Sequence, residues 1–196
     1  MLIIRCNQLA THRQVVFILT PPTVIWGLIE YARLHNPRVN DVVIKVLGPM
    51  MRRDEQRKLT GTFYFLIGCI VCLWWFPEDV AALALIFLSW CDPAASLVGV
   101  TYGHYTWPVG NGKSLAGTLA AILTATVSTW VLYSFVLTDT LPEGMPLWVA
   151  CVVFGLIAGF AEGVNLLGID DNLTMPVITS LLILTFFNTW PLLTTP

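Results

Sequence analysis

Six apolar runs, separated by short polar stretches, dominate the pattern of hydrophobic and polar positions along the chain. Each run approaches the roughly 20 residues that a helix needs to cross a bilayer. The pattern therefore predicts an all-α, polytopic integral membrane protein with about six transmembrane helices. The runs cover residues 15 to 34, 62 to 77, 80 to 101, 114 to 137, 147 to 166 and 173 to 190.

The first two runs are marginal. Thr20-Pro21-Pro22 interrupts one of them, and the other is short and meets Pro77-Glu78-Asp79. Proline can kink a membrane helix without ending it, because neighbouring groups take up the carbonyls that it frees. Both runs are therefore expected to be spans.

Composition agrees with this pattern. The 196 residues are 56% hydrophobic and 11% charged, with a mean hydropathy of +0.74, values that exclude an ordinary water-soluble domain. We expect one membrane-embedded domain over residues 15–196, preceded by a separate segment over residues 1–14. Cys69-x-x-Cys72 has the spacing of a zinc or redox motif, but it has no second pair and favours buried thiols.

The positive charges are strongly asymmetric. Nine of the ten Lys and Arg residues lie in the first 58 positions, and six of them fall in the basic loop 35–60. The positive-inside rule places that loop in the cytoplasm, and the charge is topological information, with no nucleic-acid partner implied. The segment 42–53, VVIKVLGPMMRR, is typical of a helix lying on an anionic lipid surface. Counting spans from this loop returns residues 102–113 and 167–172 to the cytoplasmic face.

Asp92 is a carboxylate well inside the third apolar run. Such a group costs at least ~2.5 kcal/mol in a membrane, so a partner or a water-filled cavity is expected. Helical spacing puts it on one small, polar face, which is formed by Ser89, Asp92, Ser96, Gly99 and Gly103. A structural acid bonded to a neighbouring helix is the alternative to a catalytic role.

Lys113 is the only Lys or Arg after Lys58, and it lies in the sequence Gly110-Asn111-Gly112-Lys113-Ser114 before an apolar helix. Backbone N–H groups at a helix start and an ammonium group together attract phosphate. The match to the P-loop pattern is incomplete and follows a helix, which argues against a Walker-type NTPase. An interfacial anchor is the alternative for this lysine.

Three further acids lie near the same predicted face. Glu162 is beside the stripe Gly155, Gly159, Gly163, whose spacing favours close helix contact. Asp170-Asp171 precedes the last run and could supply oxygens to Mg²⁺. The alternatives are a structural partner for Glu162 and a helix N-terminal acid pair for the two aspartates.

Three ordered motifs resemble the CTP-using polyprenol and lipid kinase family, which includes dolichol kinase, phytol kinase and the fungal-type CTP-dependent diacylglycerol kinases. They are LSWCDPAASLVGVTYGHY, GNGKSLAGTLAA and AEGVNLLGIDDNLTMPVITSLL, and the resemblance covers about residues 15–190. It is strongest to the diacylglycerol kinase branch. It implies transfer of the γ-phosphate of CTP to diacylglycerol, giving phosphatidate at the cytoplasmic face of the endoplasmic reticulum or nuclear envelope.

The resemblance also implies a divalent cation, Mg²⁺ or another such as Ca²⁺, and a set of site residues. Lys113 is assigned to phosphate, Asp92 and Asp171 to metal or lipid hydroxyl, and Glu162 to a supporting acid, and these four form the expected catalytic set. The expected nucleotide-binding residues are Gly99, Gly103, Gly112, Lys113, Ser114 and Gly117. The expected metal ligands are Asp92, Asp170, Asp171 and Asn172.

The sequence departs from the family at two points. Family members carry an Arg-Lys pair and a His before an additional first membrane helix, and residues 1–14 do not match them. Pro93 follows Asp92 where small residues are common. The alternatives are therefore a dolichol or phytol kinase, a phosphatidate cytidylyltransferase, and a truncated or inactive relative.

Overall fold

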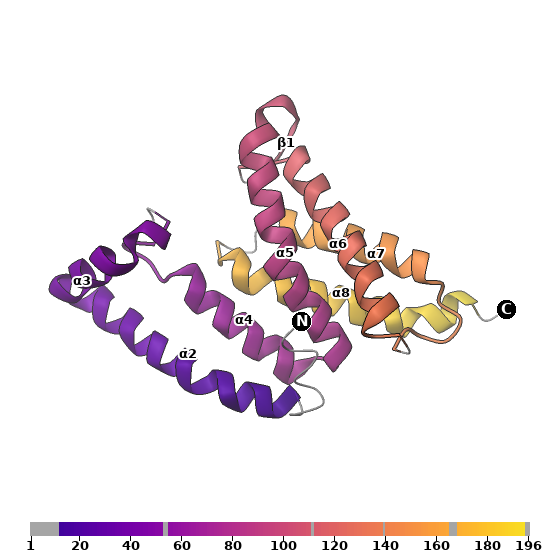
Figure 1. The fold of residues 1–196 in the computed structure, drawn as a ribbon, viewed down its shortest axis with the longest axis horizontal. Coiled ribbons are helices and arrows are strands. Elements are labelled where there is room, and N and C mark those ends of the chain that lie inside the picture. The colour runs from indigo at the N-terminus through magenta and orange to yellow at the C-terminus, as the bar shows by residue number, and fades with distance from the viewer. Residues whose placement is uncertain (1–11, 53–54, 111, 139, 165–167, 195–196) are drawn as a thin grey trace.

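A computed structural model describes residues 12–52, 55–110, 112–138, 140–164 and 168–194 and confirms the predicted all-α, polytopic class. Every predicted span corresponds to one helix (Figure 1). Most of the separate segment predicted over residues 1–14 lies outside the described residues. The elements are α2 (His12–His35), α3 (Pro37–Leu47), η1 (Gly48–Met50), α4 (Gly61–Trp75), α5 (Glu78–Tyr102), η2 (Gly103–Tyr105), β1 (Pro108–Gly110), β2 (Lys113–Ser114), α6 (Leu115–Phe135), α7 (Leu147–Gly163) and α8 (Asp171–Thr194).

Four of the described helices are long and apolar enough to cross a membrane, and α4 and α7 are shorter apolar helices. The proline pair in the first run does not end α2, which continues through Pro21 and Pro22. Hydroxyl groups of Thr20 and Thr23 donate to the carbonyls of Val16 and Leu19, at 2.8 and 2.7 Å. These two carbonyls flank those of Phe17 and Ile18, which lose their helical N–H donors to the prolines.

Part of the basic loop forms the helix expected there. Pro37 begins α3, and the side chain of Asn36 caps it by accepting a hydrogen bond from Arg38 N at 3.0 Å. No residue of α3 is buried, and Val42 and Val46 are exposed on its surface. An exposed helix therefore forms, but it covers only 42–47 of the predicted segment 42–53, and its contact with lipid stays a prediction.

The helices pack around α5 and α8. Helix α8 packs on α4, α5 and α7, while α2 packs mainly on α4 and α3 (Figure 1). Fully buried apolar side chains fill the space between α5, α7 and α8, including Phe87, Phe154 and Ile183. The thiols of Cys69 and Cys72 are buried, as expected, and Ser180 Oγ donates to Cys72 Sγ at 3.6 Å.

Small residues allow close approach on both sides of α6. A Cβ on Gly117 would lie 2.8 Å from the carbonyl oxygen of Ala95 in α5, and Cβ atoms on Gly155 and Gly159 of α7 would collide with side chains of α6. The predicted glycine stripe is wrong at its third member. A Cβ added at Gly163, the last residue of α7, would meet no atom within 4 Å, so this glycine makes no close helix contact.

Replacing Gly117 with Val is expected to destabilise the protein by about 1–3 kcal/mol, because the new atoms would push α6 away from the α5 backbone. The measurement is the thermal unfolding midpoint of the full chain in detergent. Gly163→Val, which adds the same atoms to open space at a helical glycine, is the matched control. Equal midpoints for the two variants would contradict the close contact.

Candidate active site

The loop expected between α5 and α6 is a short hairpin. Strands β1 and β2 pair antiparallel, and Gly110 pairs with Lys113 across the turn. Gly110 and Gly112 have φ of 103° and 77°, which is the left-handed region that a residue without Cβ adopts at little cost. The glycine pair flanking Asn111 was the available signal for this turn. It fixes Lys113 immediately before α6, and Ser114 caps that helix by accepting from Gly117 N at 3.3 Å.

The side chain of Lys113, in β2, forms ion pairs with carboxylates from α7 and α8. Its ammonium nitrogen is 3.0 Å from Glu162 Oε1 at the end of α7 and 3.7 Å from Asp171 Oδ2 at the start of α8. It also donates to the backbone carbonyl of Glu162. The Glu162 side chain is only 8% exposed, so this pair is largely shielded from water. The structure thus brings together three residues that the sequence predicted separately.

The two adjacent aspartates have different roles. Asp170 caps α8, because its Oδ1 accepts hydrogen bonds from Asn172 N at 3.0 Å and from Asn172 Nδ2 at 2.7 Å. Asp171 instead lies between Lys113 and Arg52, whose guanidinium nitrogen is 3.9 Å from Asp171 Oδ1. The capping interpretation therefore holds for Asp170, while Asp171 faces the other charges.

Arg52 belongs to the segment predicted to lie on a lipid surface, and the structure also places it at the candidate site. The loop after η1 turns back towards the start of α8 and places the guanidinium beside Asp171. Burial lowers the pKa of Arg52, but four nearby carboxylates outweigh that effect and raise it overall, with Asp171 contributing most. The sequence offered no signal that separates Arg52 from the other five cations of the loop.

Asp92 faces the same group of charges from α5. Its carboxylate is half-buried and interacts electrostatically with Asp171 and Lys113. It makes no hydrogen bond or ion pair with the described residues, so the expected structural partner is not found among them. The small, polar helix face predicted around Asp92 does not pack as a whole against another helix. Two of its members, Ser89 and Ser96, are exposed.

Most glycines expected to bind the nucleotide have a packing role. A Cβ on Gly103 would lie 2.8 Å from Ser114 Oγ, and one on Gly99 would lie 3.4 Å from the same oxygen. Gly117 packs against α5 in the same seam. Close contact between α5 and α6 therefore accounts for these small residues, and their contact with a nucleotide stays a prediction.

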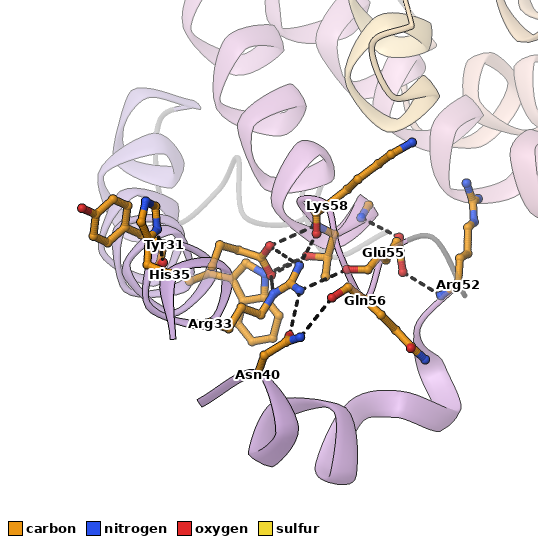
Figure 2. Close-up of polar contacts among 12 residues, drawn as sticks. Tyr31, Arg33, His35, Asn40, Arg52, Glu55, Gln56 and Lys58 are labelled. Carbon is orange, nitrogen blue, oxygen red and sulfur yellow. Dashed lines mark hydrogen bonds and ion pairs between the residues drawn. The ribbon is translucent and has the colours of Figure 1, made fainter. Parts of the chain in front are cut away.

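A second polar cluster, which the sequence analysis missed, supports the loop that carries Arg52. Arg33 of α2 is fully buried and pairs with Glu30 through two nitrogens, at 3.0 and 2.6 Å (Figure 2). Glu30 also accepts from Thr60 N and Thr60 Oγ1, at 3.1 and 3.0 Å. The available signal was a Glu–Arg pair at i, i+3 inside an apolar run.

The same cluster holds the ends of the loop. Arg33 donates to the carbonyls of Glu55, at 3.0 Å, and Lys58, and to the Asn40 side chain at 3.4 Å (Figure 2). Asn40 Nδ2 donates in turn to the carbonyl of Gln56 at 3.1 Å. These contacts tie α2, α3 and the loop into one polar unit next to the start of α4.

Over most of its length the chain is similar to proteins named CTP-dependent diacylglycerol kinase 1. It is 36% identical to the one from Eremothecium gossypii over 167 residues, covering 79% of this chain and 53% of that protein. The match to the Schizosaccharomyces pombe protein is 35% identical over 158 residues, covering 79% and 72%. The chain belongs to the CTP-dependent diacylglycerol kinase family.

A third member of this family, from Saccharomyces cerevisiae, is 30% identical over 188 residues, covering 89% of this chain and 65% of that protein. The chain thus spans about half the length of the Eremothecium protein and about two thirds of the Saccharomyces one. No family model and no solved structure matches it. The three relatives share one name, which favours the diacylglycerol kinase branch over the sister kinases and cytidylyltransferases.

A divalent cation, as expected from the resemblance to this kinase family, fits the donor set. Within the described residues, no three His, Cys, Asp or Glu side chains form a ready-made cage. Mg²⁺ does not need one, because it commonly binds one or two carboxylates together with water and substrate phosphates. Asp92 and Asp171 are the best-placed donors, since Asp170 Oδ1 is already engaged by two N–H groups.

Proposed function

We propose that this chain transfers the γ-phosphate of CTP to the free hydroxyl of diacylglycerol, forming phosphatidate. The observation that carries the proposal is the position of Lys113 between Glu162 and Asp171, where the end of α7 and the start of α8 meet the start of α6. A fixed cation beside carboxylates at a helix start is suited to a nucleotide polyphosphate and its metal. Membership of a family whose named relatives use CTP and diacylglycerol supports the same reaction.

In this reaction the lipid hydroxyl oxygen forms a bond to the γ-phosphorus, and the bond from that phosphorus to the β,γ-bridging oxygen breaks. CDP leaves with the electron pair, and the hydroxyl proton passes to a carboxylate of the site. Lys113 stabilises the charge on the transferred group and on the leaving CDP. Glu162 positions Lys113 through its carboxylate and its backbone carbonyl.

Asp92 and Asp171 are the candidates to accept the hydroxyl proton and to hold Mg²⁺ or another divalent cation. When bound, such a cation neutralises phosphate charge and orients the phosphates. Asp92 suits the lipid side of the site, because it lies inside a membrane-spanning helix and makes no hydrogen bond or ion pair with the described residues. Asp171 suits the nucleotide side, because it contacts both cations.

We place the reaction at the cytoplasmic face of a multi-pass protein in the endoplasmic reticulum membrane, within one domain over residues 15–196. Support comes from the basic loop 35–60, which the positive-inside rule assigns to the cytoplasm. Arg52 of that loop contacts Asp171 at the start of α8, so the loop and the site are on one face. CTP of the cytosol would therefore reach the site directly.

The full chain, purified in detergent with CTP labelled at the γ-phosphate, Mg²⁺ and diacylglycerol, is expected to yield labelled phosphatidate. Chelation of divalent cations with EDTA should abolish the product, because the phosphate charge would be left without its metal. Triacylglycerol, which has no hydroxyl, is the matched lipid control, and mass spectrometry identifies the product.

Other products would overturn the proposal in recognisable ways. Equal use of ATP would contradict the choice of donor, and preferential labelling of dolichol or phytol would assign a sister activity. CDP-diacylglycerol formed from phosphatidate with release of pyrophosphate would identify a cytidylyltransferase.

A further inference from the structure

Arg52 contacts the site from the side opposite Lys113. The two cations approach different oxygens of one carboxylate, with Lys113 at 3.7 Å from Asp171 Oδ2 and Arg52 at 3.9 Å from Asp171 Oδ1. They come from loops 61 positions apart in the sequence. Asp171 is therefore held between two positive groups at the point where a polyphosphate is proposed to bind.

The backbone N–H of Arg52 is bonded to a buried acid, while its side chain is largely exposed. Glu55, a buried residue, accepts hydrogen bonds from Arg52 N at 2.8 Å and from Gly61 N at 2.7 Å. Arg33 in turn donates to the carbonyl of Glu55 at 3.0 Å. The Arg52 side chain is 57% exposed and points away from this cluster (Figure 2). A largely exposed guanidinium thus extends from an anchored backbone.

The contact between Arg52 and Asp171 is too long to be a strong hydrogen bond. At 3.9 Å the pair is an ion pair without good hydrogen-bond geometry, and exposed pairs of this kind contribute little to stability. The guanidinium can therefore leave Asp171 at small cost. A phosphate, which accepts two parallel hydrogen bonds from the guanidinium fork, would hold it more strongly.

Charge balance at the site also calls for a second cation. The site gathers the carboxylates of Asp92, Glu162, Asp170 and Asp171, against the positive groups of Lys113 and Arg52. Four negative and two positive groups leave an excess of negative charge before any nucleotide binds. Without Arg52, an anionic triphosphate would face, among the described residues, only the cation of Lys113 and a larger repulsion.

We propose that Arg52 is a second phosphate-binding residue of the nucleotide site, held in position by Glu55 and the buried Glu30–Arg33 pair. In the free protein the guanidinium of Arg52 forms an ion pair with Asp171, and when the nucleotide binds it moves to the phosphates. This exchange releases Asp171 Oδ1 for the metal or the lipid hydroxyl. The inference rests on the proposed function, because it assumes that the site binds a nucleoside triphosphate.

The test compares Arg52→Gln, Arg52→Lys and Arg57→Gln in the full chain. Arg57 is an exposed cation of the same loop, so its substitution controls for the general loss of loop charge. Arg52→Gln is expected to raise the KM for CTP by about 10- to 100-fold, the range for loss of a charge-assisted hydrogen bond. The KM for diacylglycerol and the thermal midpoint should stay unchanged. Arg52→Lys should recover part of the CTP affinity, and Arg57→Gln should match the wild type.

Direct binding of labelled CTP to the purified protein separates this inference from the proposed function. If the wild type binds CTP and forms phosphatidate while Arg52→Gln keeps the same KM for CTP, the role of Arg52 is overturned and the function stands. A lower kcat or midpoint without a change in that KM would show that Arg52 is only a structural partner of Asp171, and would also overturn it. A wild-type chain that binds no triphosphate would overturn both.

Discussion

Replacing Lys113 with Gln in the full chain is expected to lower kcat/KM for CTP by about 10²- to 10³-fold, the loss seen when a transition-state charge partner is removed. The reason is that Lys113 is fixed among the site carboxylates by its ion pairs with Glu162 and Asp171. The measurement is initial-rate formation of phosphatidate over a range of CTP concentrations. Lys45→Gln, at an exposed position of α3, is the charge-matched control.

Loss of Lys113 also leaves the buried Glu162 carboxylate without its cation, which could lower stability and so mimic a catalytic defect. The double variant Lys113→Gln/Glu162→Gln removes both charges and separates the two effects. Its thermal midpoint should recover towards the wild type, while its activity should stay as low as that of the single variant. Recovery of activity together with stability would contradict a phosphate-binding role for Lys113.

Replacing Arg33 with Met is expected to destabilise the protein by about 3–5 kcal/mol, because it leaves the Glu30 carboxylate buried without its partner. Arg33 also supplies donors to the carbonyls of Glu55 and Lys58, and these would lose their hydrogen bonds. The measurement is the thermal midpoint in detergent, followed by the fraction of protein that elutes as a single species. The loop that carries Arg52 should unfold before the helices, because it loses the hydrogen bonds that Arg33 donates to its carbonyls.

Arg38→Met, the same change at an exposed position of α3, is the control for this prediction. Adding Glu30→Gln to Arg33→Met should restore part of the lost stability, because the neutral amide keeps an acceptor for Thr60 without a buried charge. A midpoint for Arg33→Met equal to that of Arg38→Met would contradict a structural role for the buried pair.

The fold was largely predictable because apolar length alone identifies membrane helices. The predicted spans match the observed helices closely, and proline at positions 21 and 22 was correctly read as tolerated. The hairpin around Gly110 and Gly112 was not predicted, because a two-residue strand leaves almost no periodic signal. Gly163 was misassigned because glycine spacing does not reveal which glycines of a helix face a neighbouring helix.

The site was predicted only in part, for a physical reason. Lys113 and Glu162 were noticeable because each is a charge in an otherwise apolar stretch, where the cost of burial requires an explanation. Arg52 was hidden among five similar cations in a polar loop, where a charge costs nothing. What distinguishes it is a contact with Asp171, more than a hundred positions away, and no local pattern encodes a contact of that range. The metal ligands, including Asp170 and Asn172, stay predictions.

Asp171, at the start of α8, is synthesised after the other charged residues of the site. Ribosomes make chains from the N-terminus, so Arg52 and its anchoring cluster emerge first, Lys113 follows, and Asp171 arrives with the last of the described helices. Until α8 inserts between α4, α5 and α7, Arg52 and Lys113 lack the Asp171 carboxylate with which both form ion pairs. A chain in which α8 has not yet inserted therefore lacks Asp171 at the proposed site, which is incomplete until that step.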